Sequence, residues 1–286
     1  MLFSMHQPAL VRITRPANAI ISGGTAVLAY FIATGSLIPE TLLLFSAVLL
    51  ITAAGNTIND VYDAAIDAIN RPDRPIPSGE LSITTAYRYA FILFFTGIGI
   101  SIFTNPICLL IVIINSILLI LYAKTLKGVP VAGNIAVAYL SGSIFLFGGA
   151  LAGIDGLIII LPLAGITLFG TLAREILKDA EDIDGDTAGG AKTLPMIIGV
   201  QSSGRVALAS ACIAVSASII PFTWWGLPYL IGILIVDLFI LRIVFETTGC
   251  NTPSCILNLN VTTNLKYAMY AALLVFTVAG GMEIFI

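Results

Sequence analysis

Long apolar runs, separated by short polar connections, make up most of the chain. Each run approaches the ~20 residues that a helix needs to cross a bilayer. Turn-forming residues such as Asn105-Pro106 and Gly226-Leu-Pro228 separate several of them. The pattern predicts an all-α integral membrane protein with nine transmembrane helices. The predicted spans cover residues 17–37, 40–64, 84–103, 106–123, 132–152, 155–178, 203–221, 224–243 and 265–285.

Composition supports a membrane protein without a separate soluble domain. Of 286 residues, 58% are hydrophobic and only 10% are charged, against roughly 25% charged in soluble domains. The mean hydropathy is +1.03. No polar stretch is long enough to bury a core of its own, so we predict a single polytopic domain over residues 1–286. The net charge of −3 gives no indication of a nucleic-acid partner.

The cysteine pattern predicts neither a disulfide framework nor a zinc site. Cys108 and Cys212 lie in apolar runs, where a free thiol behaves as a small hydrophobic side chain. Cys250 and Cys255 lie in a polar loop that lacks the further His or Cys ligands of a zinc site.

Basic residues define a predicted topology. With the N-terminus in the cytoplasm, the loops after the second, fourth, sixth and eighth spans also face the cytoplasm. All 13 Lys and Arg fall in the N-terminal segment, in these loops, or at the edges of these loops. The outer loops carry Glu40 and Asp155 and no base. This distribution follows the positive-inside rule and predicts a multi-pass protein of the cell membrane with a cytoplasmic N-terminus. Two of the inner loops are long and acidic, which suggests a pseudo-repeat of spans 1–4 and 5–8 around a central cavity.

The first acidic loop contains Asn59, Asp63 and Asp67. On a helix, residues spaced by four lie on one face about a turn apart. Acids at membrane depth are costly and stacked like charges repel, so a divalent cation between them would explain the pattern. Oxygen ligands of this kind suit Mg²⁺, which commonly takes one or two carboxylates together with substrate phosphates.

The second acidic loop places six acids between Glu175 and Asp186. Asp182 and Asp186 repeat the spacing of four, and Lys178 lies among them, where it can meet a carboxylate or a phosphate. A single charged run of this kind is often only a solvated segment. Two such clusters on one side of the membrane, both continuing membrane helices, favour a paired metal and phosphate site there, on the cytoplasmic side.

These motifs resemble the signatures of the UbiA superfamily of intramembrane prenyltransferases. The first signature is matched by Asn59-x3-Asp63-x3-Asp67 and by the following Asn70-Arg71-Pro-x-Arg74-Pro-x-Pro-Ser-Gly79. The second is matched by Asp182-x3-Asp186 followed by Lys192-Thr193. Shorter matches occur at Arg15-Pro16-x-Asn18 and Tyr122-Ala-Lys124-x-x-Lys127, so the resemblance covers essentially the whole chain.

The resemblance implies a role for each matching residue. Asn59, Asp63 and Asp67 would bind one Mg²⁺ and the diphosphate of a prenyl donor, and Asp182 and Asp186 would bind a second Mg²⁺. Asn18 would line the floor of a polar cavity. The residues expected to contact phosphate oxygens are Arg71, Arg74, Lys124, Lys178 and Lys192.

The second motif is most similar to archaeal family members that add a second geranylgeranyl group to geranylgeranylglyceryl phosphate in ether-lipid synthesis. The donor would then be geranylgeranyl diphosphate and the acceptor a lipid alcohol. Asp60, Asp179 and the diphosphate itself all stay open as the base. An aromatic acceptor, as in quinone synthesis, is the alternative within the family.

A transporter or channel is the alternative of another class, because intramembrane acids often mark ion pathways. Asp237, inside the eighth predicted span, could be one such acid. We prefer to interpret it as hydrogen-bonded to a neighbouring span. The acids crowd one membrane surface and the outer halves of the spans are almost purely apolar, which favours chemistry on a lipid-borne substrate.

Overall fold

The computed structural model describes residues 7–188 and 190–282, and every regular element within them is a helix. Eight of these helices are long and apolar enough to cross a membrane. The helices are α1 (Ala9–Arg12), α2 (Pro16–Thr34), α3 (Thr41–Tyr62), α4 (Ala64–Asn70), α5 (Ile83–Ser101), α6 (Pro106–Lys124), the 3₁₀ helix η1 (Leu126–Gly128), α7 (Ala132–Leu151), α8 (Gly153–Glu181), α9 (Ile183–Ala188), α10 (Leu194–Ile198), α11 (Val200–Ser218), α12 (Phe222–Thr247), α13 (Pro253–Asn258) and α14 (Val261–Met282).

The predicted all-α membrane architecture is confirmed, and each predicted span corresponds to one long helix. The seventh, α11, has 19 residues but is not among the eight helices apolar enough to qualify as spans. Its sequence contains Arg205 and several serines, which lower its hydropathy. A count of nine spans therefore stays a prediction.

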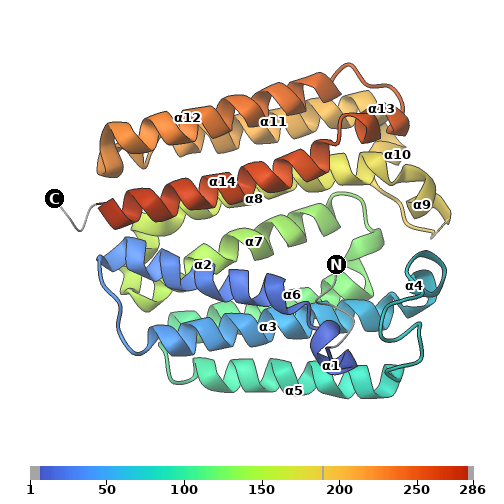
Figure 1. Ribbon diagram of the computed structural model, residues 1–286, viewed down its shortest axis with the longest axis horizontal. Helices are drawn as coiled ribbons and strands as arrows, with labels where there is room; N and C mark the ends of the chain where they lie inside the picture. The colour runs from blue at the N-terminus through green and yellow to red at the C-terminus, as the bar shows by residue number, and fades with distance from the viewer. Residues whose placement is uncertain (1–6, 189, 283–286) are drawn as a thin grey trace. The chain divides into compact units, whose positions relative to one another are not determined.

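The chain forms two compact units, residues 1–126 with 146–157, and residues 127–145 with 158–286. In the first unit α3 packs against α2, α5 and α6 (Figure 1). In the same unit α7 approaches α2 closely at a glycine. A Cβ added at Gly148 would lie 2.3 Å from the carbonyl oxygen of Ala26, so only glycine fits between these backbones.

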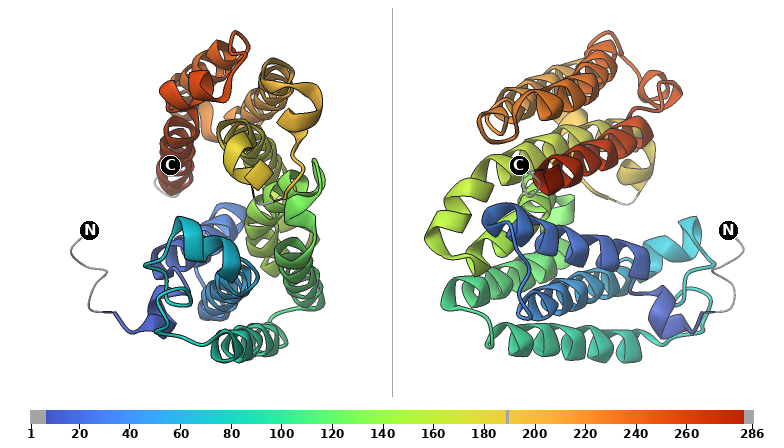
Figure 2. Two further views of the ribbon diagram at one scale, coloured as in Figure 1. Left: turned by 90° about the vertical axis from the view of Figure 1, so that its right-hand side faces the viewer. Right: turned by 60° about the vertical axis from the view of Figure 1, so that its left-hand side comes forward.

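In the first unit, the segment before α2 is fastened to the connection between α4 and α5 (Figure 2). Ile13 is 1% exposed and packs with Leu81 and Ala86. Arg12 forms an ion pair of 2.9 Å with Glu80 and donates a hydrogen bond of 3.0 Å to the carbonyl oxygen of Asp73. The long polar loop that carries the first motif is therefore held in place at both ends.

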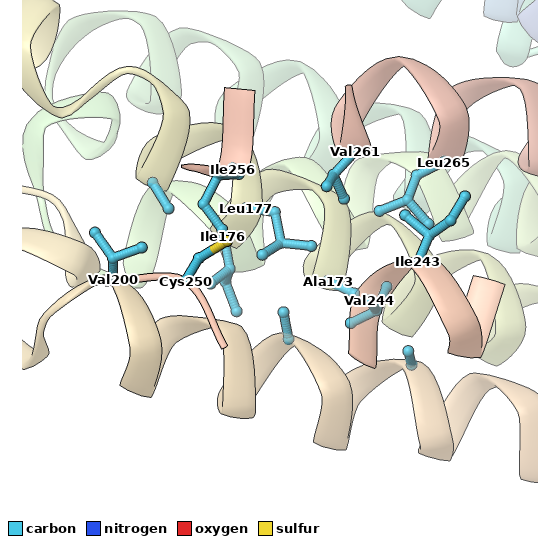
Figure 3. Packing of buried hydrophobic residues seen from close by; sticks show 13 residues of the cluster. Ala173, Ile176, Leu177, Val200, Ile243, Val244, Cys250, Ile256, Val261 and Leu265 are labelled. Atoms are coloured by element: carbon cyan, nitrogen blue, oxygen red, sulfur yellow. The ribbon is translucent and has the colours of Figure 1, made fainter. Parts of the chain in front are cut away.

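The core of the second unit gathers side chains from α8, α11, α12, α13 and α14 (Figure 3). Leu177, Val244 and Ile256 are completely buried there. Ile256 belongs to the short helix α13, in the apolar stretch before α14. Ile256 packs in the same buried cluster as residues of α8 and α12, and Cys255 and Leu259 pack against that cluster. This stretch therefore contributes to the protein core.

The expectation that no disulfide forms is wrong for one pair. Cys250 and Cys255 are disulfide-bonded, with their Cα atoms 5.5 Å apart. Cys250 follows α12 and Cys255 lies in α13, so the turn between these helices brings the two cysteines together. Cys108 and Cys212 are free thiols, as expected.

The interpretation of Asp237 as a hydrogen-bonded acid inside the protein is confirmed. It is 5% exposed, and its Oδ2 accepts a hydrogen bond of 2.6 Å from the hydroxyl of Ser218 at the end of α11. Tyr229 donates to the carbonyl oxygen of the same serine at 2.7 Å. This local arrangement satisfies a polar group within an apolar helix pair and needs no ion pathway.

Candidate functional site

The first acidic cluster lies where α3 passes into α4. The helix is interrupted at Asp63, but the backbone hydrogen bonds continue through the break. The amide of Asp63 donates to the carbonyl oxygen of Asn59 at 2.9 Å, and that of Asp67 to Asp63 at 2.8 Å. The predicted one-face arrangement of these three residues is therefore preserved, although α3 itself ends at Tyr62.

Side chains of the first cluster are largely withdrawn from the surface. Asp63 is 8% exposed and Asp67 is 6% exposed. Asn59 donates a hydrogen bond of 2.8 Å from Nδ2 to Oδ2 of Asp63. Two buried carboxylates and an amide thus lie about one helical turn apart on one face.

Arginines neutralise part of this cluster. Asp60, which is 4% exposed, accepts hydrogen bonds on Oδ1 from Arg15 at 2.5 Å and from Arg74 at 3.1 Å. Arg74 also forms an ion pair with Asp67. Arg15 precedes α2 and has a positive φ of 50°. The network thus joins the start of α2, the end of α3 and the loop after α4, which lie far apart in the sequence.

The second acidic cluster lies where α8 passes into α9. The backbone bonds run on here too, from the amide of Asp182 to Lys178 at 3.0 Å and from Asp186 to Asp182 at 2.9 Å. Asp182 and Asp186 therefore follow one another along one helical face. This matches the spacing expected from the sequence.

Two other acids of this cluster form ion pairs or hydrogen bonds with neighbouring residues. Glu175 is 8% exposed and forms an ion pair of 2.6 Å with Arg174. Glu181 accepts a hydrogen bond of 2.7 Å from the hydroxyl of Thr262 and one of 3.4 Å from its backbone amide. The Glu181 carboxylate thereby satisfies a free N–H group in the first turn of α14.

Asp179 has a different environment. Its Oδ2 accepts a hydrogen bond of 2.8 Å from the side-chain amide of Asn134 on α7. Asn134 is 7% exposed. No sequence motif pointed to Asn134, because its partner lies 45 positions away and is reached only by the packing of α7 on α8.

Asp186 is half-buried, and its pKa is raised above the ordinary value. Burial is the main cause and the neighbouring Asp182 adds to it, whereas the positive charges of Lys178 and Lys127 act in the opposite direction. The loop of Lys127 is held close to this region by a backbone bond of 3.4 Å from Lys192 to Gly128. Lys127, from the predicted loop motif, thus lies near the acids of the second cluster.

Most of the basic residues expected to contact phosphate are exposed. This group comprises Arg71, Lys124, Lys178 and Lys192. Arg74 differs, because it is already bound to Asp60 and Asp67. Asn18 is exposed in the first turn of α2.

The described residues contain no group of three or more His, Cys, Asp or Glu side chains arranged to hold a metal ion by themselves. The donor set nevertheless fits Mg²⁺. This ion usually takes only one or two carboxylates and fills its remaining positions with water and phosphate oxygens. Asp63 with Asp67, and Asp182 with Asp186, each supply such a pair.

Known proteins resemble this chain along nearly its whole length. The model of the UbiA prenyltransferase family matches residues 22–259. Digeranylgeranylglyceryl phosphate synthase of Methanoculleus marisnigri is 58% identical over 96% of this chain and 99% of that protein. The synthase of Methanoregula boonei is 53% identical over 93% of this chain and 96% of its own length.

Solved structures show the same fold. A structure from work on digeranylgeranylglyceryl phosphate synthase in membranes has a TM-score of 0.84 at 33% identity, covering 96% of this chain and 98% of that chain. A UbiA homolog from Archaeoglobus fulgidus, bound to GPP and Mg²⁺, has a TM-score of 0.67 at 19% identity. It covers 97% of this chain and 100% of that one.

Proposed function

Because the chain belongs to the UbiA prenyltransferase family, we propose that it is a digeranylgeranylglyceryl phosphate synthase. It transfers a geranylgeranyl group from geranylgeranyl diphosphate to the hydroxyl of geranylgeranylglyceryl phosphate, in archaeal ether-lipid synthesis. The observation that carries the proposal is the 58% identity to the Methanoculleus marisnigri synthase over 99% of that protein. The two acidic clusters described above supply side chains suited to the reaction.

Both clusters bind the donor through a divalent metal in this proposal. Asn59, Asp63 and Asp67 hold one Mg²⁺, and Asp182 and Asp186 hold another. Bound Mg²⁺ withdraws charge from the diphosphate and so makes it a better leaving group. The metal in the Archaeoglobus fulgidus homolog supports this assignment, as does the carboxylate pair in each cluster.

Exposed basic residues bind the phosphate oxygens of the two substrates. The side chains of Arg71, Lys124, Lys178 and Lys192 are exposed, so their charge is accessible to a ligand. Lys178 also lies 3.9 Å from the carboxylate of Glu175. Arginine suits two-pronged contact with a phosphate, whereas lysine acts as a compact point charge. Arg74 holds Asp67 and reaches phosphate only by leaving that partner. Asn18, at the start of α2, lines the polar end of the cavity.

The site faces the cytoplasm in this proposal, and the protein crosses the cell membrane nine times as one domain. Positive-inside charge placement supports the orientation, because all 13 Lys and Arg fall in the segments assigned to that side. The acceptor and the donor tail are lipids, so both substrates approach from the bilayer.

A transfer assay on purified protein in detergent tests the proposal. Radiolabelled geranylgeranyl diphosphate is supplied with Mg²⁺ or EDTA, and with either geranylgeranylglyceryl phosphate or an aromatic acid. Product formed only with Mg²⁺ and the glyceryl phosphate supports the assignment. Product with the aromatic acid alone would move the enzyme to a quinone-type pathway. No product with either acceptor would contradict the proposed activity and make transport worth testing.

A further inference from the structure

When an alcohol accepts the prenyl group, it loses its hydroxyl proton, and a base must take up that proton. In the proposed reaction the bond between C1 of the prenyl chain and the bridging oxygen of diphosphate breaks, and diphosphate leaves with the electron pair. A new bond forms between C1 and the acceptor oxygen. The hydroxyl proton must then pass to a base close to the reacting carbon.

Asp60 in the first cluster is poorly suited to this task. Arg15 and Arg74 both donate to its Oδ1. The carboxylate is 4% exposed and held in these two ion pairs, so it has little access to a substrate. Asp60 therefore acts as an anchor for arginines.

Most acids of the second cluster are also engaged. Glu175 is bound to Arg174, and Glu181 is hydrogen-bonded to Thr262. Asp182 and Asp186 are the proposed metal ligands. The remaining acid whose side chain the structure describes is Asp179.

Asp179 has the features that a base requires. Its hydrogen-bond partner is the neutral amide of Asn134, at 2.8 Å on Oδ2. Within the described part of the chain, Oδ1 forms no hydrogen bond and neither oxygen forms an ion pair. One oxygen thus orients the carboxylate while the other keeps its lone pairs available.

The position of Asp179 on α8 also fits. It lies three residues before Asp182. Asp179 is therefore about one helical turn deeper in the α8 span than Asp182. In the proposed binding mode the diphosphate is bound at Asp182 and Asp186, and the apolar prenyl chain extends from there along the apolar part of α8, on the side of Asp179. The acceptor hydroxyl must approach C1 of this chain.

We propose that Asp179 is the general base, taking the acceptor proton on Oδ1, and that Asn134 is the positioning residue that holds it. The inference rests on the proposed transferase activity. A fixed base is effective because geometry is set before the proton moves. The neutral amide orients the carboxylate without adding a positive charge that would weaken it as a base.

Asp179→Asn tests the proposal with little change of shape. The substituted amide can still hydrogen-bond to Asn134, so the α7–α8 contact is retained. Glu181→Gln is the matched control, because it removes a charge from the same helix end while its amide oxygen still accepts from Thr262. Three quantities are measured: the transfer rate, the Mg²⁺-dependent affinity for geranylgeranyl thiolodiphosphate, and transfer to an acceptor carrying a thiol in place of the hydroxyl.

We expect Asp179→Asn to lower transfer to the alcohol by about 10²–10⁴-fold, the usual contribution of a general base. Donor-analogue affinity should stay within about twofold. The thiol acceptor should recover most of the rate, because a thiol, with a pKa of about 8.5 in free cysteine, is far more acidic than an alcohol and depends less on a base. Glu181→Gln should resemble the unmodified protein in all three measurements.

Three results would overturn the inference. The first is a transfer rate in Asp179→Asn within about tenfold of the unmodified protein. The second is an equal loss of transfer rate with the alcohol and thiol acceptors, and the third is a loss of donor-analogue affinity that parallels the loss of rate. The last two would assign Asp179 to the structure or to the metal site. Absence of transfer in the unmodified protein would instead show that the proposed function had failed. That outcome is recognised before any variant is compared.

Discussion

Removing the Asp60 carboxylate should destabilise the protein more than removing a surface acid. Asp60 is 4% exposed and holds Arg15 at 2.5 Å and Arg74 at 3.1 Å. Breaking a buried ion pair by deleting one partner typically costs about 3–5 kcal/mol, because an uncompensated charge stays buried. Here Arg74 retains Asp67, and the Arg15 side chain is 34% exposed and can reach water. We therefore expect the lower end, about 3 kcal/mol, for Asp60→Ala.

The assay is reversible unfolding of the purified protein by SDS in mixed micelles, without Mg²⁺. The matched control is Glu80→Ala, which breaks the ion pair with Arg12 at a glutamate whose side chain is 44% exposed. Exposed pairs contribute about 0–1 kcal/mol, so this variant should lie close to the unmodified protein. Asp60→Ala and Arg15→Gln should also be non-additive when combined, because each removes the same contact.

Equal unfolding midpoints for Asp60→Ala and Glu80→Ala would refute this reasoning. Such a result would mean that the network is solvated, or that Arg15 and Arg74 find other partners at no cost. Full additivity of the Asp60 and Arg15 changes would refute the contact itself. Hydrogen exchange over residues 71–82 gives an independent measurement, and faster exchange is expected in Asp60→Ala.

Three further predictions concern the metal ligands, Asp186 and the disulfide. Asp63→Ala and Asp182→Ala should each abolish transfer in the radiolabel assay while circular dichroism shows the same helix content; normal activity in either would contradict the two-metal site. Burial is the main cause of the raised Asp186 pKa, so this carboxyl group is protonated more readily in the metal-free folded protein than in the unfolded chain. The contribution of Asp186 to stability is present below the ordinary value of 3.8 and is lost as pH rises through the raised pKa. Mg²⁺ and the proton compete for this carboxylate, so half-saturation by Mg²⁺ should need more metal as pH falls through the raised pKa; an unchanged Mg²⁺ requirement would argue against Asp186 as a ligand. Reducing the bond between Cys250 and Cys255 releases a loop of sequence separation 5, for which chain entropy gives about 2 kcal/mol; the SDS midpoint should drop with reductant in the unmodified protein and stay constant in a Cys250→Ser, Cys255→Ser variant.

Much of the architecture is determined by the sequence alone. A helix in a bilayer satisfies its own backbone hydrogen bonds, so an apolar run of sufficient length is enough to predict it. The prediction of a turn at Gly226-Leu-Pro228 is correct only in part, because Gly226 has a positive φ of 62° but forms a kink inside α12, which begins at Phe222. The spacing of Asn59, Asp63 and Asp67 likewise depends only on local helical geometry, and the backbone ladder through Asp63 preserves it.

Tertiary structure decided which of the polar residues are engaged with one another. Sequence motifs left Asp60 and Asp179 equivalent as candidate bases. Their difference arises from Arg15, 45 positions before Asp60, and from Asn134, 45 positions before Asp179. The disulfide between Cys250 and Cys255 likewise depends on how the chain turns after α12. The contacts of Arg15 with Asp60 and of Asn134 with Asp179 join segments brought together only by helix packing, whereas periodicity and spacing describe only neighbours along one helix.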